Sequence, residues 1–215
     1  QFASVVGQAG KLMRLDCRSR EFEYFPFNPK GYQLVLVNSK VKHELVGSPY
    51  NDRRRSCENV VAAIAAQFPD RHFETLRDAE WTDLEAVRNK VSEEDYSRAH
   101  YVLGEKDRVL AVCEALNQGD YETVGQKMYE THDGLSNEYD VSCEELDFLN
   151  DIARECGVTG SRIMGGGFGG CTINLVKEER YDHFVEEVTK RFAAKYGHAP
   201  EVYPVVISDG SHKVC

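Results

Sequence analysis

Positive charge, paired cysteines and long apolar runs are all scarce in this 215-residue sequence. Lysine and arginine number 26 against 36 acidic residues, and the net charge of −10 argues against nucleic acid or an anionic membrane as a partner. The seven cysteines include no C-x-x-C pair, which indicates reduced thiols and a cytoplasmic location. No apolar run approaches the roughly 20 residues that a membrane-spanning helix needs, so no membrane partner is expected.

Motifs for several kinds of catalytic site are missing as well. There is no Gly-Lys-Ser/Thr phosphate loop and no G-x-S-x-G nucleophile elbow, so Ser/His/Asp catalysis stays open but unsupported. The seven histidines are dispersed, and we expect surface or core residues rather than metal ligands. Because the chain begins at Gln1 rather than at a methionine, we expect it to be a piece of a longer protein.

The most unusual stretch present is Met164–Cys171, in which five of eight residues are glycine. Gly165, Gly167 and Gly170 fit the dinucleotide fingerprint G-x-G-x-x-G, which needs a strand before it and a helix after it. The sequence instead predicts a helix before the glycines and a strand, Thr172–Val176, after them. A nucleotide-binding Rossmann fold is therefore disfavoured. Two interpretations stay open: close packing of a helix on a strand, or a loop that faces an anion or substrate.

The rest of the chain predicts an α+β fold with a mostly antiparallel sheet. Period-two or continuous apolar patterns predict strands at 11–16, 21–25, 32–37 and 201–207, the last at a sheet edge because it contains Pro204. Helical spacing predicts helices from residue 51 to about 68, over 96–116 and 121–132, and over 181–196. Two capping boxes, Thr82-x-x-Glu85 and Ser142-x-x-Glu145, predict further helix starts. The break between Pro26 and Gly31 marks a candidate domain boundary.

Two features near the first of these helices suggest a site. Arg53, Arg54 and Arg55 occupy its first turn, where the helix dipole disfavours cations. They form either a solvated face or a contact with an anionic neighbour. Tyr50 lies between Pro49 and the helix start, and is either a packing residue or a side chain that projects into a cleft.

Three stretches together resemble a family of small-molecule kinases. Residues 38–43 (Asn-Ser-Lys-Val-Lys-His), followed by Tyr50-Asn-x-Arg-Arg-x-x-Cys57, resemble a galactokinase signature, and Tyr139-x-Val-Ser-x-x-Glu-Leu-Asp147 resembles another. The glycine loop up to Cys171 resembles the third motif of the GHMP kinases in its galactokinase form. The opening Gln1-Phe-Ala-Ser4 also matches, so the resemblance spans essentially the whole chain.

This resemblance implies a two-part organisation. Residues 28–215 would form the GHMP kinase C-terminal domain, and residues 1–27 a remnant hairpin of the N-terminal, ribosomal S5-like domain. The implied activity of the intact protein is ATP-dependent phosphorylation of galactose to galactose 1-phosphate in the Leloir pathway, with Mg²⁺ and ATP bound by the intact enzyme.

The resemblance also implies the site residues. Tyr50 would bind the sugar, and an active-site glycine loop would pack against the phosphate-transfer region: Gly165, Gly166, Gly167, Phe168, Gly169 and Gly170. The catalytic base is expected just before Gln1 and the ATP loop farther upstream. We therefore expect no catalytic residue, metal site or bound cofactor in these 215 residues, and no activity from them alone.

Two other functions stay open on the sequence. Some galactokinase-like proteins are galactose-sensing regulators without turnover, and other GHMP kinases act on other small metabolites. The sequence also departs from the family pattern in two places. Met164 stands where many relatives have threonine, and Thr131-His-Asp-Gly134 replaces the commoner Ser-His-x-Ser.

Overall fold

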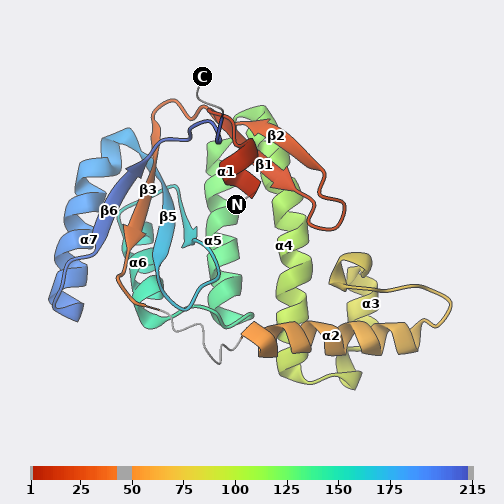
Figure 1. Cartoon of the computed structure of the whole chain (residues 1–215). Helices are drawn as coiled ribbons and strands as arrows, with labels where there is room; N and C mark the ends of the chain where they lie inside the picture. Colours follow the sequence, from red (N-terminus) through yellow and green to blue (C-terminus); the bar gives the residue numbers. More distant parts are fainter. Residues whose placement is uncertain (1, 43–49, 213–215) are drawn as a thin grey trace.

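The computed structural model describes residues 2–42 and 50–212. Gln1, His43 and Pro49, which belong to motifs named above, lie outside the described residues, as does Cys215. The structure is α+β, with a four-stranded sheet at one side and a group of helices at the other (Figure 1). No described helix combines the length and apolar character that a membrane crossing would require.

The four-stranded sheet has the order β4-β5-β3-β6, and every neighbouring pair is antiparallel. Its strands are β3 (Tyr32–Asn38), β4 (Gly160–Ile163), β5 (Cys171–Lys177) and β6 (Glu201–Val205). The predicted mostly antiparallel sheet is confirmed, and β6 lies at an edge as Pro204 predicted. Within the continuous apolar run of β3, Val35 and Val37 are fully buried, whereas Leu34 and Leu36 on the other face are only partly buried.

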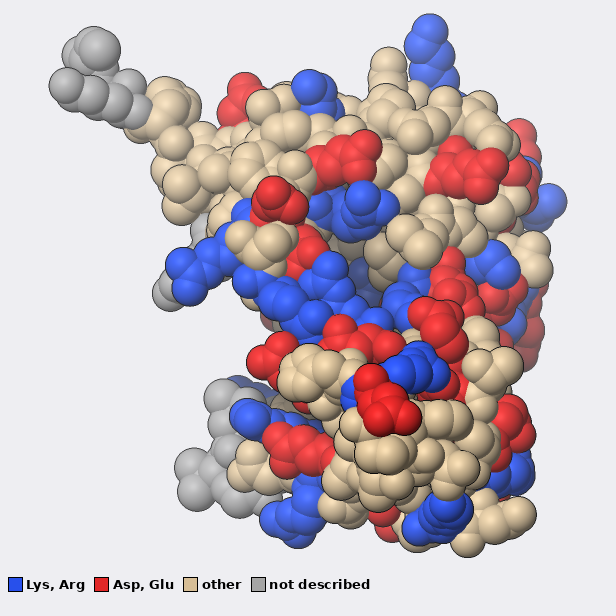
Figure 2. All heavy atoms as spheres, turned by 90° about the vertical axis from the view of Figure 1, so that its right-hand side faces the viewer, with Lys and Arg blue, Asp and Glu red and all other residues tan. Residues whose placement is uncertain are grey.

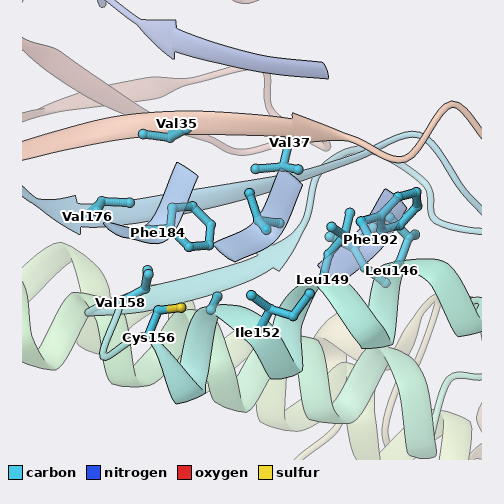
Figure 3. Packing of buried hydrophobic residues seen from close by; sticks show 13 residues of the cluster. Val35, Val37, Leu146, Leu149, Ile152, Cys156, Val158, Val176, Phe184 and Phe192 are labelled. Atoms are coloured by element: carbon cyan, nitrogen blue, oxygen red, sulfur yellow. The ribbon is translucent and has the colours of Figure 1, made fainter. Parts of the chain in front are cut away.

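One face of the sheet is covered by α6 (Glu144–Glu155) and α7 (Tyr181–Tyr196). Val35 and Val37 of β3 point toward Phe184 and Phe192 of α7 across this layer, and Ile152 comes from α6 (Figure 3). All five side chains are fully buried. The opposite face packs on α4 (Glu93–Gln118) and α5 (Tyr121–Asn137).

A second group of helices has its own apolar core, away from the sheet. It consists of α2 (Tyr50–Gln67), α3 (Trp81–Ala86), one end of α4 and the short turns η1 (Leu76–Asp78) and η2 (Arg88–Lys90). Val60 and Ile64 of α2 are fully buried here, which confirms the predicted apolar face of that helix. The remaining turn, η3 (Glu178–Arg180), leads into α7.

The N-terminal segment forms α1 (Phe2–Val6) and a separate two-stranded sheet of β1 (Lys11–Leu15) and β2 (Phe22–Pro26). The hairpin matches the two strands expected at 11–16 and 21–25, whereas α1 was not predicted. Phe25 and Phe27 at its end are buried against Leu116 of α4 and Leu175 of β5.

Three local predictions are wrong. The strand β4 precedes the glycine run, so the order is strand, glycines, strand rather than helix, glycines, strand. Thr82 lies inside α3, and the capping boxes nearby are Thr75 with Asp78 and Glu80 with Asp83. Helix α6 begins after Cys143, and the Ser142 hydroxyl donates to Asp147 instead of capping the helix.

Two Arg–Asp pairs join the tip of the hairpin to η1. Arg18 donates to Asp78 at 2.8 Å, and Arg77 donates to Asp16. The Arg77 guanidinium, helped by backbone N–H groups of Arg18 and Ser19, lowers the pKa of Asp16 from its ordinary value of 3.8. The Arg18 guanidinium does the same for the pKa of Asp78, together with backbone N–H groups of Thr75 and Glu74.

These pairs predict a pH dependence of stability. Because each folded pKa lies below the unfolded one, the stabilisation is present above about pH 4 and is lost as the pH falls below it. An Arg77→Gln variant should therefore lose less free energy of unfolding than wild type on acidification from about pH 5 to pH 2. Urea titrations at several pH values measure this. Arg54→Gln, which removes a 2.7 Å bond to Glu58 inside α2, is the control; parallel curves for all three proteins would contradict the prediction.

Candidate functional site

The glycine loop joins β4 to β5 and adopts a conformation that few other residues allow. Gly165, Gly167, Gly169 and Gly170 have φ values of 85°, 86°, 136° and 83°, and Phe168 between them has φ 57°. Left-handed backbone of this kind is costly for residues with a Cβ, so the composition of the loop follows from its geometry. The Met164 N–H donates to the Cys171 carbonyl at 2.9 Å and closes the base of the loop.

Two segments from distant parts of the chain hold the loop from either side. On one side, the Gly170 N–H donates to the Val41 carbonyl at 3.2 Å, and the Gly170 carbonyl accepts from the backbone N–H and hydroxyl of Ser39. On the other side, the Phe168 N–H donates to the Val141 carbonyl at 2.5 Å. The glycines thus allow close packing, but against these two segments rather than between a helix and a strand as one interpretation had it.

Close approach leaves no room for a side chain at three of the glycines, and at Gly166 a Cβ would collide with the Tyr50 hydroxyl. A Cβ on Gly167 would collide with the Val141 carbonyl. A Cβ on Gly169 would lie 2.9 Å from the Val41 carbonyl oxygen. A Cβ on Gly165 would meet nothing within 4 Å, so at that position only the positive φ disfavours a larger residue.

Tyr50, the first residue of α2, contacts the loop directly. Its hydroxyl donates to the Gly166 carbonyl, and its ring meets the edge of the Phe168 ring with centroids 5.4 Å apart. Burial raises the pKa of the Tyr50 phenol, so the group is a neutral donor at physiological pH. The sequence left Tyr50 as a packing or a cleft residue, and the structure gives it both a ring contact and a place beside the groove described below.

Arg53 joins the first turn of α2 to the glycine loop and to the signature that begins at Tyr139. Its guanidinium lies 5.4 Å from the Phe168 ring centroid, donates to the Tyr139 carbonyl at 3.1 Å and pairs with the Asp140 carboxylate at 2.5 Å. The side chain is buried, so this arginine has the anionic neighbour that one interpretation of the Arg-rich turn required. Arg54 and Arg55 are exposed and pair with Glu58 and Asp52 of their own helix, as a solvated face would.

A groove of about 1280 Å³ opens beside the loop. It runs between the hairpin, η1 and α4, and Tyr50, Gly165 and Gly166 form part of its wall. Figure 2 shows a hollow across this face of the molecule, with Lys and Arg side chains gathered in it and Asp and Glu side chains beside them. The charged residues of its lining are mixed in sign: Arg14, Arg18, Arg77, Lys106, Asp16, Glu21, Glu23, Glu74 and Glu105.

Sequence reasoning missed the part that α4 contributes to the groove. Val109 and Leu110 of α4 line it and are 41% and 53% exposed, which is unusual for large apolar side chains in the middle of a helix. The only signal in the sequence is that α4 carries apolar residues at more positions than one buried face needs.

A Ser/His/Asp arrangement does occur, but its geometry is not that of a nucleophile triad. The His132 Nε2 lies 3.2 Å from Asp147 Oδ1, and the Ser142 hydroxyl donates to the same oxygen at 2.5 Å. Both groups contact the carboxylate rather than each other, so the histidine has no path to deprotonate the serine. Within residues 2–42 and 50–212, no three His, Cys, Asp or Glu side chains gather closely enough to hold a metal ion.

Comparison with known proteins agrees with this geometry. Residues 112–194 match the family model of the C-terminal domain of GHMP kinases. With the α+β fold and the glycine loop, this match shows that the chain contains a GHMP kinase C-terminal domain. A solved mevalonate kinase from L. major has the same general fold, at a TM-score of 0.51 and 21% identity over 94% of this chain and 50% of that one.

Within that class, the chain is similar over its whole length to galactokinases. It is 38% identical to human galactokinase and 36% identical to that of Thermotoga petrophila, covering 100% of this chain and 52% and 58% of those proteins. The solved galactokinase of Lactococcus lactis, complexed with galactose, superimposes with a TM-score of 0.90 at 26% identity, over 99% of this chain and 55% of that one. The chain thus spans about half the length of the relatives it matches.

The glycine loop provides a matched pair of variants. Gly165 and Gly167 have nearly the same φ, so alanine at either position costs about 1–2 kcal/mol for the left-handed backbone. Only Gly167→Ala also drives a methyl group into the Val141 carbonyl, for about 1–3 kcal/mol more. Equilibrium urea unfolding of the two variants should show this order, and equal losses would mean that the contact with Val141 does not restrain the loop.

Proposed function

We propose that the intact protein is a galactokinase, which transfers the terminal phosphoryl group of ATP to the anomeric hydroxyl of galactose. One structural observation supports the proposal in addition to the sequence similarity to galactokinases. The segments that resemble galactokinase signatures lie far apart in sequence, yet Ser39, Tyr50, Arg53 and Val141 all contact the one loop or its immediate support. A signature retained by chance has no physical reason to converge in this way.

The glycine loop would act by position and charge rather than by covalent chemistry. Phosphoryl transfer needs little from the protein except alignment of the reactants and stabilisation of developing negative charge. Backbone that combines right-handed and left-handed residues can present N–H groups to an anion, and Gly165 and Gly166 border the groove. Tyr50 lies at the same wall. Because its hydroxyl proton is donated to the Gly166 carbonyl, its oxygen would accept a hydrogen bond from a sugar hydroxyl.

The remaining parts of the site would come from sequence outside these residues. The general base is expected just before Gln1, and the ATP loop and the groups that bind Mg²⁺ upstream of it. When bound, Mg²⁺ neutralises charge on the phosphates, but the described residues offer no cluster that fits it. Residues 1–27 would belong with the N-terminal domain and residues 28–215 would form the C-terminal one, in a cytoplasmic enzyme.

The direct test is a kinase assay on the intact protein with galactose and Mg·ATP. Galactose-dependent ADP formation, with galactose 1-phosphate as product, is the expected result. Galactose binding without turnover would identify a sensor instead, and turnover with a different small metabolite in place of galactose would identify another GHMP kinase.

Tyr50→Phe tests the sugar contact in the intact enzyme. Loss of one neutral hydrogen bond costs about 0.5–1.5 kcal/mol, which corresponds to a roughly two- to tenfold lower kcat/KM for galactose with little change in the KM for ATP. Tyr203→Phe, at an exposed tyrosine of the edge strand β6, is the matched control. A lower kcat at unchanged galactose KM would assign the hydroxyl to holding Gly166, and wild-type kinetics would assign the tyrosine to packing.

The chain of residues 1–215 should not phosphorylate galactose by itself. The proposed function places the base, the ATP loop and the metal site elsewhere, and one wall of a site cannot align an ATP that nothing holds. Purified 1–215, freed of host kinases, should show neither turnover in a coupled assay nor tight ATP binding by calorimetry. Turnover above that of a mock purification would refute this assignment of the missing groups.

A further inference from the structure

A polar cluster with a buried histidine and a partly exposed carboxylate lies directly behind the segment that supports the glycine loop. It consists of His132 and Ser136 of α5, Ser142, and Asp147 of α6. The Asp147 carboxylate is its centre: Oδ1 accepts from Ser142 at 2.5 Å and lies 3.2 Å from His132 Nε2, and Oδ2 accepts from Ser136 at 3.0 Å. His132 is only 3% exposed, and its Nδ1 has no hydrogen-bond partner among the described residues.

The hydrogen bonds of this cluster converge on the Asp147 carboxylate, and the His132 ring faces it through Nε2. Burial opposes ionisation of Asp147, but hydrogen bonds from His132, Ser142 and Ser136 outweigh it and lower the pKa of that carboxyl. Asp147 is therefore an anion that is bonded by three side chains: His132 and Ser136 of α5, and Ser142 of the segment before α6.

The donor that matters for the loop is Ser142. It follows Val141, whose carbonyl accepts the Phe168 N–H and against which Gly167 is packed. Residues 139–141 are already restrained on the other side by Arg53, which bonds the Tyr139 carbonyl and Asp140. Asp147 thus fixes one end of the supporting segment and Arg53 the other.

We propose that Asp147 is a positioning residue, which acts through Ser142 and Val141 to set the place of the Phe168 N–H and hence of the glycine loop. His132 faces Oδ1, the same carboxylate oxygen to which Ser142 donates, whereas Ser136 bonds the other oxygen, Oδ2. The part of this inference that concerns turnover rests on the proposed function, whereas the part that concerns the order of the loop does not.

The cluster contains its own control. Ser142 and Ser136 both donate to Asp147, so Ser142→Ala and Ser136→Ala each remove one hydroxyl from the same carboxylate. Only Ser142 is attached to the segment that carries the Val141 carbonyl; Ser136 belongs to α5. A general structural role predicts similar effects of the two changes, and a positioning role predicts that they differ. Replacing Asp147 itself is less informative, because it leaves His132 and Ser136 without their acceptor.

The first experiment measures amide hydrogen exchange of the intact protein in the peptide that spans residues 164–171. Loss of a hydrogen bond to a charged group should speed exchange there about tenfold in Ser142→Ala, with less than about twofold change in Ser136→Ala. Ser142→Thr, which keeps the hydroxyl, should restore slow exchange. Equal exchange in the two alanine variants, or no rescue by threonine, would overturn the proposal.

The second experiment measures kinetics with galactose and ATP. Ser142→Ala should lower kcat about five- to tenfold with both KM values little changed, while Ser136→Ala and Ser142→Thr stay near wild type. Equal losses of kcat in both alanine variants would leave Asp147 as a structural residue. Absence of turnover by the wild-type protein would refute the proposed function, and the exchange comparison would then decide the positioning role by itself.

Discussion

The arrangement of the site depends on one buried cation. Arg53 is removed from water near the start of α2, where the helix dipole is unfavourable to it. A guanidinium in such a place needs acceptors, and it finds the Tyr139 and Asp140 carbonyls, the Asp140 carboxylate and the face of Phe168. These partners bring the first turn of α2, the 139–141 segment and the glycine loop to one point. Tyr50 takes its position beside Gly166 because Arg53, one turn later, is anchored there.

The two apolar cores explain why a groove exists at this point. The sheet with α6 and α7 forms one core, and α2, α3 and one end of α4 form another. The long helix α4 takes part in both this second core and the packing on the far face of the sheet. Its middle, with Val109 and Leu110, is covered by neither, and the hairpin lies across from it. The groove is thus the space along α4 between its contacts with the second core and its contacts with the far face of the sheet.

The sequence correctly predicted those strands and helices that have a regular spacing of apolar side chains. The strand β3 and the apolar face of α2 follow from side-chain patterns, and the edge position of β6 follows from Pro204. The strand β4 was missed because four residues, Gly-Ser-Arg-Ile, are too short to show a period and hold only one large apolar side chain. The glycine loop was found by composition, but its partners Val41 and Val141 were not, because contacts over such sequence distances leave no local trace.

The wrong prediction that Ser142 caps a helix shows why the candidate site could be predicted only in part. Ser142-x-x-Glu145 has the form of a capping box, yet a hydroxyl bonds the strongest acceptor within reach, and here that is the Asp147 carboxylate. The same replacement of a local partner by a distant one occurs at Arg53, whose acceptors lie 86 and 87 residues away. Ser142 bonds Asp147 instead of capping its helix, and Arg53 bonds residues 139 and 140 instead of a neighbour in its own helix. Both bonds restrain the 139–142 segment. The glycine loop, whose left-handed backbone has little local stabilisation of its own, is ordered by these restraints together, so its geometry is a property of the whole fold rather than of its own eight residues.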